Sequence, residues 1–282
     1  MNFAAIAPIA RLRDIEENAV HMALAHLCDN EKYVNFYKGQ SDQGKFIILD
    51  NSVIELGKAV TPEFLLEAAG KIAAHEIVVP DVYNNASETV KLARQFIPKI
   101  KNHGYRLMGV AHGKNISEWL WCVRNLIDCG VDTIGVPKVI VQNMGPTGRV
   151  NCLRNLARKF APHEIPTIHL LGVWDDPLEM LRIYLEEAKG TINRIRSVDS
   201  AIAYVYASYG YHFGEGARPK GKVNFFSGDC NGYIHLKNIM EMRQMCGDPM
   251  RLCGLEDEYA YTGTEKIVHL DDGVIKVDFQ RG

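Results

Sequence analysis

The chain has 282 residues, of which 47% are hydrophobic and 23% charged, a composition typical of a soluble globular protein. Its 32 basic and 34 acidic residues give a net charge of −2, which excludes nucleic-acid binding through bulk positive charge alone. No apolar run approaches the roughly 20 residues that a membrane-spanning helix needs, and the first residues lack the pattern of a signal peptide. We therefore expect a cytoplasmic protein with no membrane partner.

Seven cysteines are scattered along the chain without any CxxC pair. This pattern is typical of reduced thiols in a cytosolic protein. Cys230, Cys246, Cys253 and His269 are separated by 16, 7 and 16 residues, which is not the compact spacing of zinc ligands. We expect no metal site and no zinc subdomain.

Eight short apolar segments recur along the first 200 residues, at 3–7, 20–27, 46–49, 76–79, 106–111, 133–136, 167–173 and 195–198. They are rich in Ile, Val and Leu without polar alternation, as are strands buried on both faces of a parallel sheet. Amphipathic helical stretches begin at residues 61, 84, 117 and 176. This alternation predicts an α/β fold. We favour a (β/α)8 TIM-type barrel over a doubly wound sheet, because no GxGxxG motif follows any strand.

The pattern changes after residue 210. We expect residues 1–210 to form the barrel core and residues 211–282 to form a short C-terminal appendage packed on it. The appendage comprises a basic loop with Arg218, Lys220 and Lys222, a helix at about 233–246, and a hairpin at 268–277 with an Asp-Gly turn. The helix is a candidate for the eighth helix of the barrel.

Four polar residues stand where apolar strands end: Asp50, Asp81, His112 and Asp199. Because the carboxyl ends of the strands meet at one mouth of a parallel barrel, we expect these side chains to converge there. Helix capping is the simpler role for each aspartate taken alone. Several carboxylates around one pocket suit either a Mg²⁺ site or a division of labour between nucleophile and acid/base, as in retaining glycosyl transfer.

Lys138 follows the strand segment 133–136. A lysine at such a position can form a Schiff base, neutralise a phosphate, or remain a solvated loop residue. Lys138 belongs to one basic group with Arg149, Arg154 and Arg158, and the loop at 218–222 forms another. Either group is a candidate contact for nucleic-acid phosphates.

The order of these motifs over about residues 1–210 resembles the tRNA-guanine transglycosylases, and more closely the shorter DpdA-type 7-deazaguanine DNA transglycosylases of phages. The segment around Asp50 lies where the family has Asp-Ser-Gly-Gly with its acid/base aspartate. Val-Pro-Asp at 79–81 matches the aspartate that binds the base. Asp199 lies where the family has Phe-Asp-Cys, whose aspartate is the nucleophile.

Three further segments are similar to family motifs. Residues 109–113 resemble Gly-Ile-Val-Gln-Gly, with His112 in place of the glutamine; residues 134–136 resemble the Ile-Gly-Gly-Leu loop, and residues 170–173 the Leu-Met-Gly-Val strand. The resemblance therefore implies a base-binding set made of Asp81, His112, Gly113, Gly135 and Gly172.

The resemblance implies a DNA-guanine transglycosylase that exchanges guanine in DNA for a free 7-deazaguanine, such as 7-cyano-7-deazaguanine, through a covalent Asp199–glycosyl intermediate. Asp50 would act as the general acid and base, and no cofactor is needed. The expected partners are DNA, with its guanine flipped or single-stranded, and the free base; a second copy of the chain is left open. A phage-encoded protein would act in the host cytoplasm. The Cys-x-Cys-x-x-Cys segment of the tRNA enzymes is absent, which favours DNA over tRNA.

Three alternatives remain. The first is a tRNA-guanine transglycosylase. The second is a class I aldolase-like barrel in which Lys138 forms an imine. The third is a barrel that binds a base or a nucleic acid without catalysis. For stacking on the base, the candidates are Tyr83, or Tyr204 and Tyr206.

Overall fold

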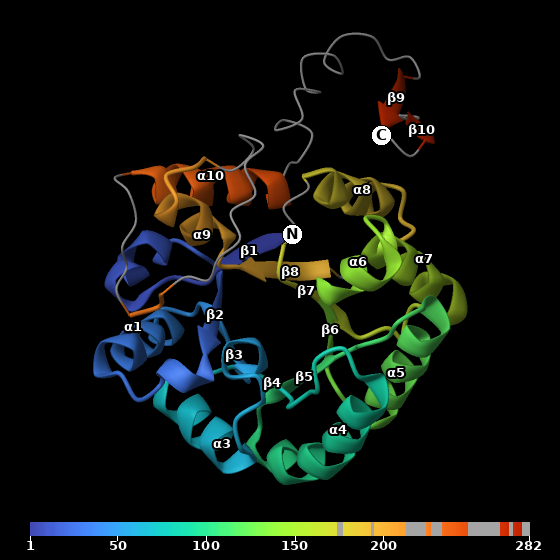
Figure 1. Cartoon of the computed structure of the whole chain (residues 1–282). Helices are drawn as coiled ribbons and strands as arrows, with labels where there is room; N and C mark the ends of the chain where they lie inside the picture. Colours follow the sequence, from blue (N-terminus) through green and yellow to red (C-terminus); the bar gives the residue numbers. More distant parts are fainter. Residues whose placement is uncertain are drawn as a thin grey trace.

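In the computed structural model, the described residues are 1–173, 177–192, 195–212, 224–226 and 233–247, together with the strands at 266–270 and 273–277. Eight parallel strands form a nearly closed barrel, with the order β1-β8-β7-β6-β5-β4-β3-β2 (Figure 1). The strands are β1 (Asn2–Ala5), β2 (Val20–Leu24), β3 (Phe46–Asp50), β4 (Glu76–Val78), β5 (Arg106–Val110), β6 (Thr133–Pro137), β7 (Thr167–Leu171) and β8 (Ile195–Ser200). Each coincides with one of the eight predicted segments, so the prediction of a (β/α)8 barrel is confirmed.

Helices surround the strands (Figure 1). The α-helices that follow the strands are α1 (Glu31–Asp42), α2 (Val53–Leu56), α3 (Pro62–Lys71), α4 (Ala86–Ile100), α5 (Ile116–Asp128), α6 (Val139–Met144), α7 (Gly148–Lys159), α8 (Pro177–Ala188) and α9 (Ile202–Ser208). Short 3-10 helices are η1 (Ile9–Ile15), η2 (Ala25–Leu27) and η3 (Lys101–His103). Helix α10 (Ile234–Gly247) packs against β1, α8 and α9, which places it in the outer ring.

Side-chain caps set where several helices begin. Thr61 accepts a hydrogen bond from the backbone N–H of residue 64, and Asn85 and Asn115 cap α4 and α5 in the same way. Such caps satisfy backbone donors that have no partner within the helix. These three helices therefore start within two residues of the positions predicted from the sequence.

The floor of the barrel is closed by a buried ion pair. Glu76, at the start of β4, accepts two hydrogen bonds from Arg196 at the start of β8, at 2.5 and 3.2 Å. Thr133 Oγ1 donates to the same carboxylate at 2.5 Å. Glu76 is fully buried. A buried carboxylate is costly without partners, and these donors compensate its charge.

The C-terminal part bears out the predicted helix and hairpin. Strands β9 (Lys266–Leu270) and β10 (Gly273–Val277) pair antiparallel, and the two turn residues between them lie outside the described residues. The same holds for Arg218, Lys220 and Lys222, so the basic loop stays a prediction. None of the helices in the described residues combines the length and hydrophobicity that crossing a bilayer requires.

Buried His21 on β2 gives a stability prediction. Its ring makes T-shaped contacts with the rings of Phe36 and Tyr37. Burial, aided by the positive charge of Lys45, lowers its pKa from 6.5 to about 4. The unfolded chain therefore takes up a proton at higher pH than the folded protein does. Above pH 6.5, protonation of His21 does not reduce the free energy of unfolding. Between pH 6.5 and 4, we expect His21 to lower the free energy of unfolding by about 3 kcal/mol.

Urea unfolding at a series of pH values measures this effect. His21→Leu should flatten the acid limb of the stability curve, whereas His163→Leu, at an exposed loop position, should leave it unchanged. An acid limb of equal steepness in His21→Leu would show that other groups cause the acid sensitivity.

Candidate active site

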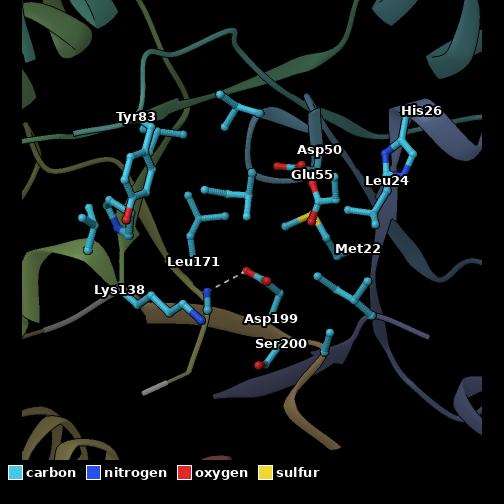
Figure 2. Close-up of a pocket in the computed structure, with 18 of the residues that line it drawn as sticks. Met22, Leu24, His26, Asp50, Glu55, Tyr83, Lys138, Leu171, Asp199 and Ser200 are labelled. Atoms are coloured by element: carbon cyan, nitrogen blue, oxygen red, sulfur yellow. Dashed lines mark hydrogen bonds between the residues drawn. The ribbon is translucent and has the colours of Figure 1, made fainter. Parts of the chain in front are cut away.

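A cavity of about 770 Å³ opens at the mouth formed by the carboxyl ends of the strands. Asp50, Asp81 and Asp199 all line it, together with His112 and Lys138. Figure 2 shows Asp50 and Asp199 facing the same space from β3 and β8. The residues predicted to converge therefore do share one cavity. The remaining predicted glycines differ: Gly172 lines the cavity, whereas Gly113 and Gly135 do not.

Both hydrogen bonds that position the Asp199 carboxylate end on one of its oxygens, Oδ1. Oδ1 accepts a hydrogen bond from His169 Nε2 at 2.9 Å and from the backbone N–H of Gly172 at 3.2 Å. The second of these bonds is the dashed line that ends on Asp199 in Figure 2. Within the described residues, Oδ2 receives no hydrogen bond, and the side chain is 9% exposed. A carboxylate fixed through one oxygen with the other open to the cavity can act as a nucleophile.

His169 lies on β7, inside the barrel, and is fully buried. Its Nδ1 is 2.8 Å from Ser197 Oγ, and this oxygen accepts a hydrogen bond from Arg196 Nε. An ionised Asp199 can only accept a hydrogen bond, so Nε2 is the donor in its contact with Asp199. In the neutral imidazole, Nδ1 then accepts a hydrogen bond from the Ser197 hydroxyl.

Gly172 adopts a left-handed backbone conformation, with φ of 75°. A Cβ atom at this position would lie 2.9 Å from Cδ of Lys138. Arg149 Nη1 donates to the Gly172 carbonyl at 2.7 Å, which fixes the loop that also points the Gly172 N–H at Asp199. The position therefore favours glycine for both its conformation and its close packing.

Asp50 ends β3, and its Oδ2 accepts a hydrogen bond from the backbone N–H of Ser52 at 2.7 Å. Burial raises the pKa of Asp50 well above its usual value, and the negative charge of Glu55 raises it further. The charges of Asp199 and Asp81 act in the same direction. This environment favours the protonated, proton-donating form of Asp50.

Glu55→Gln should therefore lower the pKa of Asp50, because it removes the strongest of the neighbouring negative charges. If activity needs the protonated Asp50, activity falls as pH rises through this pKa. We expect the alkaline limb of the kcat/KM profile to move to lower pH. The pKa of Asp50 should stay above its usual value, because burial and the charges of Asp81 and Asp199 still raise it. Glu67→Gln, on the exposed face of α3, is the matched control. An alkaline limb that stays in place would contradict this assignment.

Asp81 is 3% exposed, and both of its oxygens have partners. Oδ1 accepts from Asn51 Nδ2 at 2.7 Å, and Oδ2 is 2.6 Å from His112 Nε2. His112 Nδ1 accepts the backbone N–H of Asn84, so Nε2 carries the hydrogen and donates it to Asp81. A ligand at Asp81 would use the second lone pair of each oxygen.

The basic residues fall into different environments. Lys138 is exposed at the cavity, and its ammonium makes no ion pair within the described residues. Arg149, in contrast, is fully buried and makes two hydrogen bonds to Glu179, at 2.8 and 2.5 Å. The prediction that Arg149 contacts phosphates is therefore wrong, because this ion pair occupies the guanidinium inside the protein.

Apolar and aromatic side chains form the walls and rim of the cavity. Tyr83 and Phe226 line it and are 47% and 65% exposed, while Leu171 and Val110 contribute to the wall. Such a lining is typical of a site for a small molecule. The prediction that Tyr204 and Tyr206 stack on the base is wrong. Both are buried in α9, and neither lines the cavity.

Four polar residues at this site are not predicted from the sequence: His26, Asn51, Glu55 and His169. A histidine within the apolar segment 167–171 was a signal that could have directed attention to His169. Nothing in the sequence distinguished Asn51 or Glu55 from ordinary loop residues.

A comparison with protein-family models finds no match, and a comparison with curated proteins finds no significant similarity. Within the described ranges, no group of three or more His, Cys, Asp or Glu side chains is arranged to hold a metal ion. The structure shows a (β/α)8 barrel with a carboxylate-lined cavity at its mouth. The resemblance to transglycosylases rests on the order of the sequence motifs.

Proposed function

We propose that the protein exchanges guanine in a nucleic acid for a free 7-deazaguanine base through a covalent Asp199–glycosyl intermediate. The observation that carries this proposal is that Asp50 and Asp199 line the same cavity in different environments. Asp199 offers an oxygen without a hydrogen bond among the described residues, and the environment of Asp50 favours its protonated form. One nucleophile and one acid are what retaining glycosyl transfer requires.

In the first step, Asp199 Oδ2 attacks C1′ of the target nucleotide and forms a C1′–O bond. The C1′–N9 bond breaks, its electron pair goes to the departing guanine, and the Asp50 carboxyl supplies the proton that neutralises the base. This geometry requires the base to leave its stack and enter the cavity.

In the second step, the incoming 7-deazaguanine gives its N9 proton to the Asp50 carboxylate, and N9 attacks C1′. The C1′–O bond to Asp199 breaks, and its electron pair returns to the carboxylate. Two displacements at one carbon retain the anomeric configuration.

Recognition of the base is assigned to Asp81, supported by His112. A carboxylate can accept from both the N1–H and the exocyclic amine of a guanine edge, whereas adenine offers neither donor in that arrangement. The lone pairs that Asn51 and His112 leave on Asp81 are available for this pairing. Lys138, which lines the cavity and forms no ion pair with any residue that the structure describes, would contact a phosphate. We favour DNA as the substrate because the zinc segment of the tRNA enzymes is absent from the sequence.

Incubation with radiolabelled 7-deazaguanines and either guanine-containing DNA or tRNA tests this function. We expect label to enter DNA, in single-stranded form at least. Label in tRNA alone would reverse the choice of nucleic acid. Label in neither, with folded protein, would overturn the proposal.

A second candidate, a class I aldolase-like activity, is favoured by one observation: the Lys138 ammonium lies in the same cavity without an ion pair among the described residues. A carbonyl substrate would then be trapped on Lys138 by borohydride. Lys138→Met would abolish trapping, and base exchange in the wild type without such trapping would exclude this candidate.

A further inference from the structure

We propose that His169 is a positioning residue that selects the attacking oxygen of Asp199 and stabilises this carboxylate as it leaves the sugar. The proposal deepens the base exchange described above and depends on it. Its basis is the arrangement of donors on Asp199: His169 and the Gly172 N–H both bind Oδ1, at 2.9 and 3.2 Å.

The His169 ring is fixed at both nitrogens. Nδ1 contacts Ser197 Oγ at 2.8 Å, Nε2 contacts Asp199, and the ring is fully buried. Arg196 donates to Ser197 and pairs with Glu76, so a continuous chain of hydrogen bonds runs from the floor of the barrel to the cavity. This chain holds the tautomer that donates to Asp199 and prevents the ring from rotating away.

Ser197, His169 and Asp199 have the contact order of a Ser-His-Asp triad, but the geometry reverses their roles. Ser197 is fully buried, and its oxygen already accepts from Arg196, so it reaches no substrate. The member that faces the cavity is Asp199. Here His169 therefore orients a carboxylate nucleophile, and Ser197 orients His169.

The two donors matter most when the intermediate breaks down. During its formation, Oδ2 gives up charge to the new C1′–O bond. When this bond breaks, the electron pair returns to Asp199, and negative charge spreads over both oxygens. The N–H groups of His169 and Gly172 stabilise this returning charge. Loss of His169 should therefore slow breakdown more than formation, so that the covalent adduct accumulates.

The test compares His169→Leu with wild type in base exchange and in adduct formation, the adduct being the fraction of chain linked to oligonucleotide on a denaturing gel. We expect exchange to fall by about 10- to 10³-fold and the adduct fraction to rise above that of wild type. His169→Gln, whose amide can donate to Asp199, should recover at least tenfold of the lost exchange. His163→Leu, at an exposed loop position, is the matched control.

Ser197→Ala leaves the His169 side chain intact and removes the hydroxyl that contacts its Nδ1 and accepts from Arg196 Nε. We expect a smaller change in the same two readouts, and this variant decides the question if His169→Leu does not fold. Slower exchange with an unchanged or smaller adduct fraction in both variants would overturn the role of His169. Wild-type protein that neither exchanges base nor forms an adduct would overturn the proposed function, and this inference with it.

Discussion

Asp199→Asn is expected to reduce base exchange by at least about 10⁴-fold, because an amide cannot replace the attacking carboxylate. The substitution preserves the shape of the side chain, and the amide oxygen can still accept from His169 and Gly172. We therefore expect the variant to fold and to keep binding oligonucleotide. Exchange of labelled base and covalent adduct on a denaturing gel are the measurements, and both should be lost.

Asp42→Asn provides the control for this experiment, since Asp42 is exposed on α1 and forms a surface ion pair with Lys38. It should retain wild-type exchange. If Asp199→Asn kept exchange within tenfold of wild type, or still formed the adduct, then Asp199 would not be the nucleophile and the proposed mechanism would be wrong.

Arg149→Met is expected to destabilise the protein by about 3–5 kcal/mol, because it leaves the carboxylate of Glu179 buried without its counter-charge. Both side chains are almost completely buried, and two hydrogen bonds join them. Arg149 also holds the Gly172 carbonyl, so the loop that donates to Asp199 should loosen as well. The midpoint of urea unfolding measures the loss of stability.

The double variant Arg149→Met/Glu179→Leu separates charge from packing. Because it removes both charges, it should recover a large part of the lost stability. Arg124→Met, which breaks an exposed pair with Glu164, should cost only about 1 kcal/mol or less. A double variant as unstable as the single one would show that packing, and not the uncompensated charge, causes the loss.

Several elements were accessible from the sequence because their signals are local. The strands are continuous apolar runs, which is how a strand covered on both faces must be composed. Helices α3, α4 and α5 begin at capping residues that the sequence displays. Helix α1 was not anticipated, because its buried face consists of Tyr33, Tyr37 and Gln40 and does not form an aliphatic stripe.

Burial of charge could not be read from the chain. Arg149 lies in a segment with three other basic residues, a pattern that predicts a surface position. It is buried because Glu179, 30 positions further on, lies opposite it on the neighbouring helix. Such pairing depends on how α7 and α8 pack, and no local pattern announces it.

The amino-acid sequence by itself determined the parallel barrel and the meeting of Asp50, Asp81 and Asp199, since parallel strands in a closed barrel bring all their carboxyl ends to one mouth. Only the tertiary structure decided what each carboxyl is free to do. Asn51 and His112 occupy both oxygens of Asp81, whereas His169 and Gly172 share one oxygen of Asp199. These donors come from neighbouring strands and loops about 30 residues away, so their positions are fixed by strand register and packing, which local sequence does not encode.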